Sequence, residues 1–188
     1  MGGQVKTGAN LESLMNALAS RDGVTRLKAR ESLVALGRPA VLLLIRALRG
    51  SKVDQVRWEA AKTLGAIGDA RAVPALVKAL EDTDPDVAWL AAEALQKLGK
   101  AAWPTLLRAL IRCGARSSAL RQGAHHVFRG QRQEGLDDLI TRLLKALEDS
   151  TVPELTLTAA HDFLEKVTAP SRRDRESFRM PKAATKAP

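Results

Sequence analysis

Aromatic residues and cysteine are scarce in this sequence of 188 residues. Aromatic residues make up 3% of the chain and tyrosine is absent. The interior must therefore be built mainly from Leu, Ala, Val and Ile, a mixture that suits closely packed helices better than a sheet. The single cysteine, Cys113, cannot form an intrachain disulfide, and no neighbouring base or orienting partner marks it as a nucleophile.

Long apolar runs are missing as well. The longest wholly apolar run, Ala40 to Ile45, is far shorter than the roughly 20 residues that cross a bilayer. Residues 1–10 lack the basic and then apolar layout of a secretory signal. These absences predict a protein without a membrane partner that resides in the reducing cytoplasm.

Positive charge is concentrated at the C-terminal end. The formal net charge is +9, from 30 basic and 21 acidic residues. Residues 169–188 have six basic and two acidic residues and too little apolar surface to fold alone, which predicts a basic flexible tail. The remaining body is mildly basic, a weaker signal than the basic stripe of a dedicated nucleic-acid binder.

A repeat of about thirty residues organises the rest of the chain. The phrase apolar-x-Ala-Leu recurs at intervals of 30, 32, 30 and 37 residues, at 15–18, 45–48, 77–80, 107–110 and 144–147. A second phrase, Val-x-x-x-Ala-Ala-x-x-Leu, stands at Val56 to Leu64 and at Val87 to Leu95. Two phrases per repeat indicate two helices per repeat, which can bury their apolar faces only against the next pair.

The spacing within the phrases is helical. Val56, Ala60, Leu64 and Ile67 lie on one stripe of a helix with 3.6 residues per turn. Three glycines at a step of 31, Gly37, Gly68 and Gly99, stand where helices end with a left-handed residue. The helices that we expect cover 11–20, 24–36, 39–49, 54–67, 71–82, 85–98, 101–113, 117–129, 135–149 and 153–168.

The best-preserved repeat has a sequence pattern typical of a known family. Val56 to Gly65 has the form Val-Arg-x-x-Ala-Ala-x-x-Leu-Gly, and Ile67-Gly68-Asp69 and Ala72-Val73-Pro74-Ala75-Leu76 follow it. This pattern resembles that of the HEAT repeat family, in the short HEAT-like form known from phycobilin lyases. The resemblance implies an all-α fold, a right-handed α-α superhelix of about ten helices over 11–168, after a disordered N-terminus at 1–10. It also implies that the helices with apolar-x-Ala-Leu line the concave surface. A longer fourth repeat, with Gly130 to Gly135 inserted, predicts an irregularity in the stacking.

Four cations occupy the variable position of the apolar-x-Ala-Leu phrase. They are Arg46, Lys78, Arg108 and Lys145, with Asn16 in the first repeat. Equivalent residues on stacked helices lie about 8 to 10 Å apart, so these four would form a cationic ladder that attracts an acidic partner. The alternative is that Lys and Arg are ordinary solvated helix formers there.

Two tryptophans, Trp58 and Trp89, share one position in consecutive repeats. Tryptophan is favoured at the centre of protein interfaces, so both are candidate partner-binding residues. Packing between repeats is the alternative.

No catalytic, cofactor or metal site is predicted. Phosphate-binding glycine loops, metalloprotease helices and nucleophile elbows are absent from the sequence. His125 and His126 are adjacent on a helix and cannot converge on one ion. His126 and His161 are expected to align across two repeats, with Asp162 as the sole nearby carboxylate.

These observations predict a non-catalytic protein-protein interaction scaffold that binds a protein, expected to be acidic, on its concave face. Two alternatives stay open. One is a HEAT-like nucleic-acid binding protein, including a DNA repair protein, which would need an acidic residue beside an exposed tryptophan in the groove. The other is a chromophore lyase component, which the family resemblance alone suggests.

Overall fold

Ten α-helices make up the part of the chain that the computed structural model describes, residues 3–149 and 152–169. They are α1 (Gly3–Ala17), α2 (Gly23–Leu36), α3 (Val41–Gly50), α4 (Asp54–Ile67), α5 (Val73–Ala79), α6 (Pro85–Leu98), α7 (Trp103–Cys113), α8 (Ser118–Phe128), α9 (Asp137–Glu148) and α10 (Pro153–Thr168). Short 3-10 turns lead into α3, α5 and α7. These residues contain no strand, so the all-α fold is confirmed. Within the same ranges, no helix is long and apolar enough to span a bilayer.

The helix boundaries follow the sequence prediction closely, with one large difference. The first helix begins at Gly3, not near position 11, so helix covers most of the segment expected to be disordered. All other boundaries lie within three residues of those expected. The predicted basic tail falls almost wholly on residues 170–188, which lie outside the described residues.

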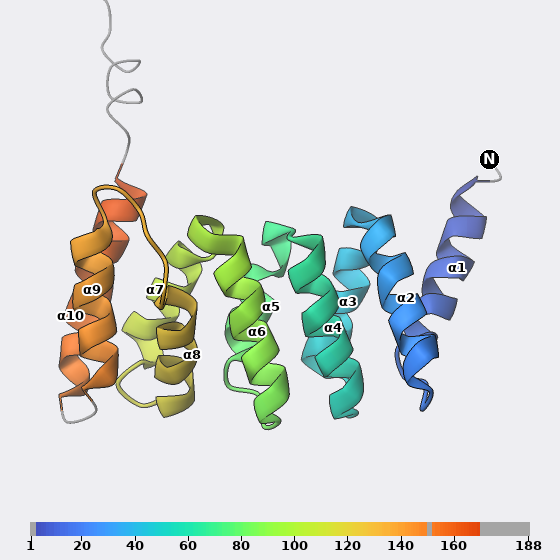
Figure 1. Ribbon diagram of the computed structural model, residues 1–188, viewed down its shortest axis with the longest axis horizontal. Helices are drawn as coiled ribbons and strands as arrows, with labels where there is room; N and C mark the ends of the chain where they lie inside the picture. The colour runs from blue at the N-terminus through green and yellow to red at the C-terminus, as the bar shows by residue number, and fades with distance from the viewer. Residues whose placement is uncertain (1–2, 150–151, 170–188) are drawn as a thin grey trace, which may run out of the picture.

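The helices stand side by side in two rows along the long axis of the molecule (Figure 1). We call α2, α4, α6 and α8 the even row, and α3, α5 and α7, which lie behind it in Figure 1, the odd row. Each even helix packs against the even helix before it, and α4, α6 and α8 also pack against the odd helix that precedes them in the chain. This arrangement confirms a repeat solenoid.

The even row is the more tightly packed of the two. Gly65 of α4 lies so near α6 that a Cβ added to it would come within 2.8 Å of the Ala94 Cβ. Consecutive odd helices pack more loosely on each other. Close packing of the even helices favours bending toward the even row, whereas the family resemblance implies that the apolar-x-Ala-Leu helices, α3, α5 and α7, line the concave surface. That expectation stays a prediction.

Backbone geometry explains the glycine step of 31. Gly37, Gly68 and Gly99 end α2, α4 and α6 with φ of 65°, 70° and 54°. Gly68 is in the left-handed helical region, whereas the other two have ψ near −125° and −130°. A side chain disfavours positive φ, so each repeat reverses direction at a residue that has none.

A buried ion cluster joins α2 to α4. The Glu59 side chain is only 3% exposed and accepts hydrogen bonds from Arg26 Nε at 3.2 Å and Arg30 Nη1 at 2.6 Å. Two cations around one buried carboxylate satisfy its oxygens, which a buried charge requires. The even row is thus held together by polar contacts as well as by small apolar residues.

The last helical pair is turned round relative to the pairs before it. In a regular stack α9 would follow α7 in the odd row, but α9 packs on α8 and α10 packs on α7. The connection between α8 and α9 contains Gly130 and Gly135, both with positive φ, and it leaves α9 beside α8 in the front row instead of carrying the chain to the odd row (Figure 1). The irregularity predicted from the longer fourth repeat is confirmed.

Three aromatic rings fasten this turned pair to the stack. Trp103 of α7, Phe128 of α8 and Phe163 of α10 are fully buried, with ring centroids 5.4 to 5.9 Å apart. Tilted rings at this distance are a favourable aromatic arrangement. Burying each Phe contributes roughly 2 to 3 kcal/mol, so this cluster compensates for the broken repeat pattern.

Candidate functional site

An exposed tryptophan stands in the middle of the even row. Trp89 of α6 is 55% exposed, and its ring lies on the His126 ring of α8 with centroids 4.1 Å apart. The His126 Nε2 atom in turn lies 2.8 Å from a carboxylate oxygen of Glu93, one turn after Trp89. The indole is therefore positioned by two neighbouring side chains, while more than half of its side chain faces solvent.

Hollows flank Trp89 on both sides. Between α6 and α8 lies a cavity of about 350 Å³, lined mainly by apolar atoms of Leu80, Ala88, Trp89, Ala92 and Gly123. A Cβ on Gly123 would come within 2.8 Å of Leu80, so its missing side chain lets α8 lie close here. Between α4 and α6 lies a smaller cavity of about 210 Å³, lined in part by Lys62, Trp89 and Lys97.

A third hollow extends this surface to α2. It has a volume of about 480 Å³ and is lined in part by Leu27, Val34, Lys62 and Lys97. Lys62 and Lys97 line both this hollow and the one between α4 and α6, and Trp89 lines both hollows beside α6. The three hollows therefore form one continuous surface from α2 to α8, which we call the even-row groove.

The charges of the even-row groove fall into two classes. Arg30 and Glu93 are held by Glu59 and His126, respectively. Glu31, Lys62 and Lys97 are exposed, and in the described chain none of them has an ion-pair partner. The Lys62 ammonium lies 4.4 Å from the centroid of the Trp58 ring, a cation-π contact.

The two tryptophans that share one position in the repeat have different surroundings. Trp58 is partly buried and packs against the core beneath Lys62, as the packing alternative predicts. Trp89 is exposed and lines two hollows, as an interface residue would. Trp58 is contacted by Lys62, one turn along its own helix, whereas the equivalent residue after Trp89 is Glu93, which binds His126 of α8.

The structure divides the predicted cationic ladder. Arg46, Lys78 and Arg108 are exposed on successive helices of the odd row. Lys145 is also exposed, but it belongs to α9, which packs beside α8 and so leaves that row. Since Trp58 and Trp89 lie on the even row, the cations and the tryptophans do not form a single site.

The odd row is nevertheless uniformly basic. Its three helices contain five basic residues and no acidic residue, and all five are exposed: Arg46, Arg49, Lys78, Arg108 and Arg112. Among these five, only Lys78 forms an ion pair within the described ranges, with Glu81 at 3.2 Å. The positive charge of the odd row is therefore partly neutralised at Lys78, in the middle of the row.

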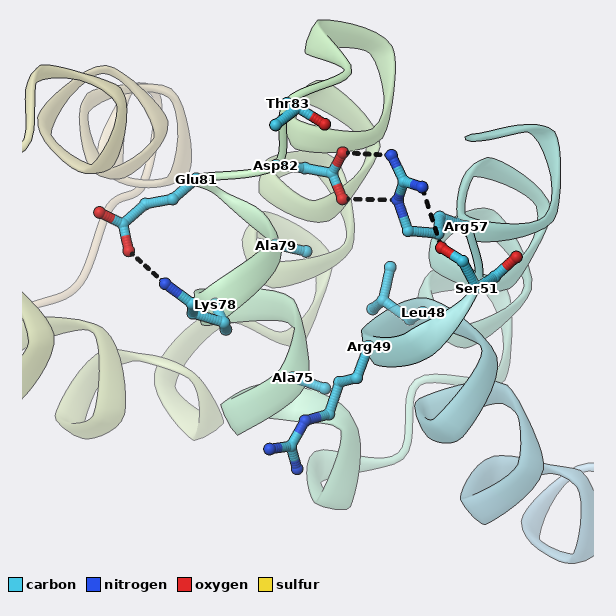
Figure 2. A pocket seen from close by; sticks show the side chains of 10 residues that line it. All are labelled: Leu48, Arg49, Ser51, Arg57, Ala75, Lys78, Ala79, Glu81, Asp82 and Thr83. Carbon is cyan, nitrogen blue, oxygen red and sulfur yellow. Dashed lines mark hydrogen bonds and ion pairs between the residues drawn. The ribbon is translucent and has the colours of Figure 1, made fainter. Parts of the chain in front are cut away.

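Figure 2 shows the hollow between α3 and α5 of the odd row, with a volume of about 450 Å³. On one side Arg57 donates to both Asp82 oxygens, at 2.9 and 2.8 Å, and to the Ser51 carbonyl at 3.0 Å. Burial raises the pKa of Asp82, but the hydrogen bonds from Arg57 and from the Asp84 backbone N–H, together with the positive charge of Arg57, outweigh it and leave that pKa below its usual value. This side of the hollow is therefore formed by a structural ion pair, and it offers no free charged side chain to a ligand.

Metal ligands do not converge in the described part of the chain. No group of three metal-ligating side chains is present there. The predicted alignment of His126 with His161 is wrong, because α8 lies in the even row and α10 packs on α7 of the odd row.

HEAT repeats are matched over residues 11–96 and again over 41–125, which together cover more than half of the chain. The match is to HEAT repeats in general and does not separate out the phycobilin lyase form. A comparison with curated proteins gives no match. The two-row stack of helical pairs agrees with the repeat match, and the chain belongs to the HEAT repeat family.

Proposed function

We propose that this chain is a non-catalytic scaffold that binds a protein partner in the even-row groove, with Trp89 as the anchor. The observation that carries the proposal is a 55% exposed indole, held by His126, at the centre of the even-row groove. Helical repeat proteins use the extended surfaces of their stacked helices for binding. Interfaces concentrate binding free energy in a few aromatic residues near their centre.

The enzymatic alternatives have less support. Glu93 does lie one turn from Trp89, as a DNA repair function would need, but its carboxylate is engaged with His126. A chromophore lyase function rests on the repeat resemblance alone, and a shared fold says little about chemistry.

Affinity purification from the native cell tests the scaffold proposal. The bait proteins are the unaltered chain, Trp89→Ala, and Leu42→Ala as a matched control, since Leu42 is an equally exposed apolar residue on the odd row, at 56%. We expect Leu42→Ala to retain the partner and Trp89→Ala to bind it about thirtyfold more weakly, as at an interface hot spot. Equal retention by both variants, with both folded by circular dichroism, would contradict the proposal.

Nucleic-acid binding by the odd row is a second candidate, supported by five exposed cations on three helices that lack acidic residues. The test measures binding of duplex DNA and of RNA by Arg46→Glu/Arg108→Glu/Arg112→Glu. A control with the same charge change on the even row is Lys28→Glu/Lys62→Glu/Lys97→Glu. Affinity should fall only for the odd-row variant, with a salt slope of about −0.9 per phosphate contact for duplex DNA. Absence of binding at low salt rejects this function.

A further inference from the structure

We infer that the even-row groove binds a partner segment that is acidic in its middle and apolar at both ends. This inference rests on the proposed function and specifies the chemistry of the segment. It follows from the order of side chains along the groove, from α2 across α4 and α6 to α8.

One end of the groove is an apolar pocket. Between α6 and α8, Leu80, Trp89 and Ala92 supply most of the wall, with the exposed indole at its rim. The charged side chain of Asp82 at this end is already bound to Arg57. A pocket with a large aromatic wall and no free charge favours an aliphatic or aromatic side chain of the partner.

The other end is apolar as well. Leu27 is 41% exposed, Val34 lies about two turns further along the same face of α2, and both line the hollow between α2 and α4. Arg30 in the same wall is held by buried Glu59 and presents no free charge. Glu31 also lines this end, so a partner carboxylate is disfavoured here and favoured further along the groove.

The middle of the groove is cationic. Lys62 and Lys97 line the same two hollows, are both exposed, and lack an ion-pair partner among the residues that the structure describes. Two like charges in one groove repel each other, and a carboxylate between them relieves this repulsion. Residues 170–188 of this chain contain six basic and two acidic residues, so their net positive charge disfavours them as the segment bound beside Lys62 and Lys97.

The dimensions set the length of the segment. Neighbouring helices lie about 8 to 10 Å apart, so the hollow between α2 and α4 and the hollow between α6 and α8 are separated by two spacings, roughly 16 to 20 Å. An extended segment rises about 3.3 Å per residue, so about five or six residues reach from one apolar end to the other. The acidic residues then fall about three positions from each apolar anchor.

Nuclear magnetic resonance titrations with synthetic peptides test this inference on the full chain. The probes are eight-residue peptides with Leu and Phe anchors about six positions apart, in both orders, and with Glu, Gln or Lys at the central positions. The readout is the indole N–H signal of Trp89, assigned by its loss in Trp89→Phe. The Trp103 indole, which is buried away from the groove, is the internal reference.

The charge-swapped variant Lys62→Glu/Lys97→Glu is compared with Arg46→Glu/Arg49→Glu, which changes the net charge equally on the odd row. We expect the unaltered chain and the odd-row variant to prefer the Glu peptide over the Gln peptide on the order of fivefold at low salt. The groove variant should prefer the Lys peptide instead.

Two results would overturn the inference: no shift of the Trp89 indole with any peptide at millimolar concentration, or the same peptide preference in the groove variant as in the unaltered chain. Either result leaves the proposed function standing if the native partner still depends on Trp89. Failure of both experiments removes the groove as a protein-binding site.

Discussion

Each repeat contributes one helix to the even row and one to the odd row, but the charged residues of the two rows have different surroundings. On the even row, Arg26, Arg30, Arg57 and Glu59 are engaged in ion pairs with little exposure. On the odd row every charged residue of the three helices is basic and exposed. Charges buried between the closely packed even helices need partners because water is removed there, whereas charges on the outer surface of either row, Lys62 and Lys97 included, are left to solvent. Charge pairing thus follows burial between helices.

The largest effect should come from breaking an even-row ion pair. Arg57→Ala leaves Asp82, 11% exposed, without the guanidinium that binds both its oxygens. We expect the free energy of unfolding to fall by about 2 to 4 kcal/mol. Arg46→Ala, at an exposed odd-row position, should change it by less than about 0.5 kcal/mol. Urea denaturation measures both, and equal losses would refute the contrast between the rows.

The packing contrast can be tested with two glycines. Gly65→Ala places a Cβ 2.8 Å from the Ala94 Cβ between even helices, which should cost about 1 to 3 kcal/mol of unfolding free energy. Gly50→Ala on α3 meets nothing within 4 Å and should stabilise the chain by up to about 1 kcal/mol. Thermal denaturation of the two variants should shift in opposite directions. A neutral Gly65→Ala would show that the even row relaxes without loss.

The smallest effect should be the response to acid. Arg57 holds the pKa of Asp82 below its ordinary 3.8 in the folded chain. A lowered folded pKa contributes stability above the unfolded value, and this contribution is lost as pH falls through the folded pKa. Urea midpoints should therefore stay level from pH 7 to about 5 and decline below about pH 4. Asp82→Asn should reduce that decline, and an unchanged decline would assign the acid sensitivity to other carboxylates.

Local features of the fold were predictable from the sequence. The apolar stripe through Val56 and Leu64 and the glycine step of 31 locate the central helices because both depend on backbone periodicity and φ preference. The extra helical turns before position 11 were missed, since that segment has no apolar stripe. The odd-row cations were found, but their separation from Trp58 and Trp89, which lie on the even row, was not.

The candidate site was only half predictable. Trp58 and Trp89 were singled out by their common position, yet their different exposures depend on Lys62 and His126, which approach from other turns and helices. Nothing in the repeat phrase indicates that Lys62 and Lys97 line the same hollow. Such convergence depends on the rotation of each helix against its neighbour.

By itself, the sequence determined that this chain forms paired helices of a HEAT repeat, because periodicity, caps and turns act over a few residues. Only the tertiary structure decided which row packs more closely, that α9 and α10 exchange rows, and that Trp103, Phe128 and Phe163 meet. The physical reason is that curvature and docking arise from contacts between residues about thirty or more positions apart. The geometry of these contacts results from many small packing interactions, and no single sequence motif determines it.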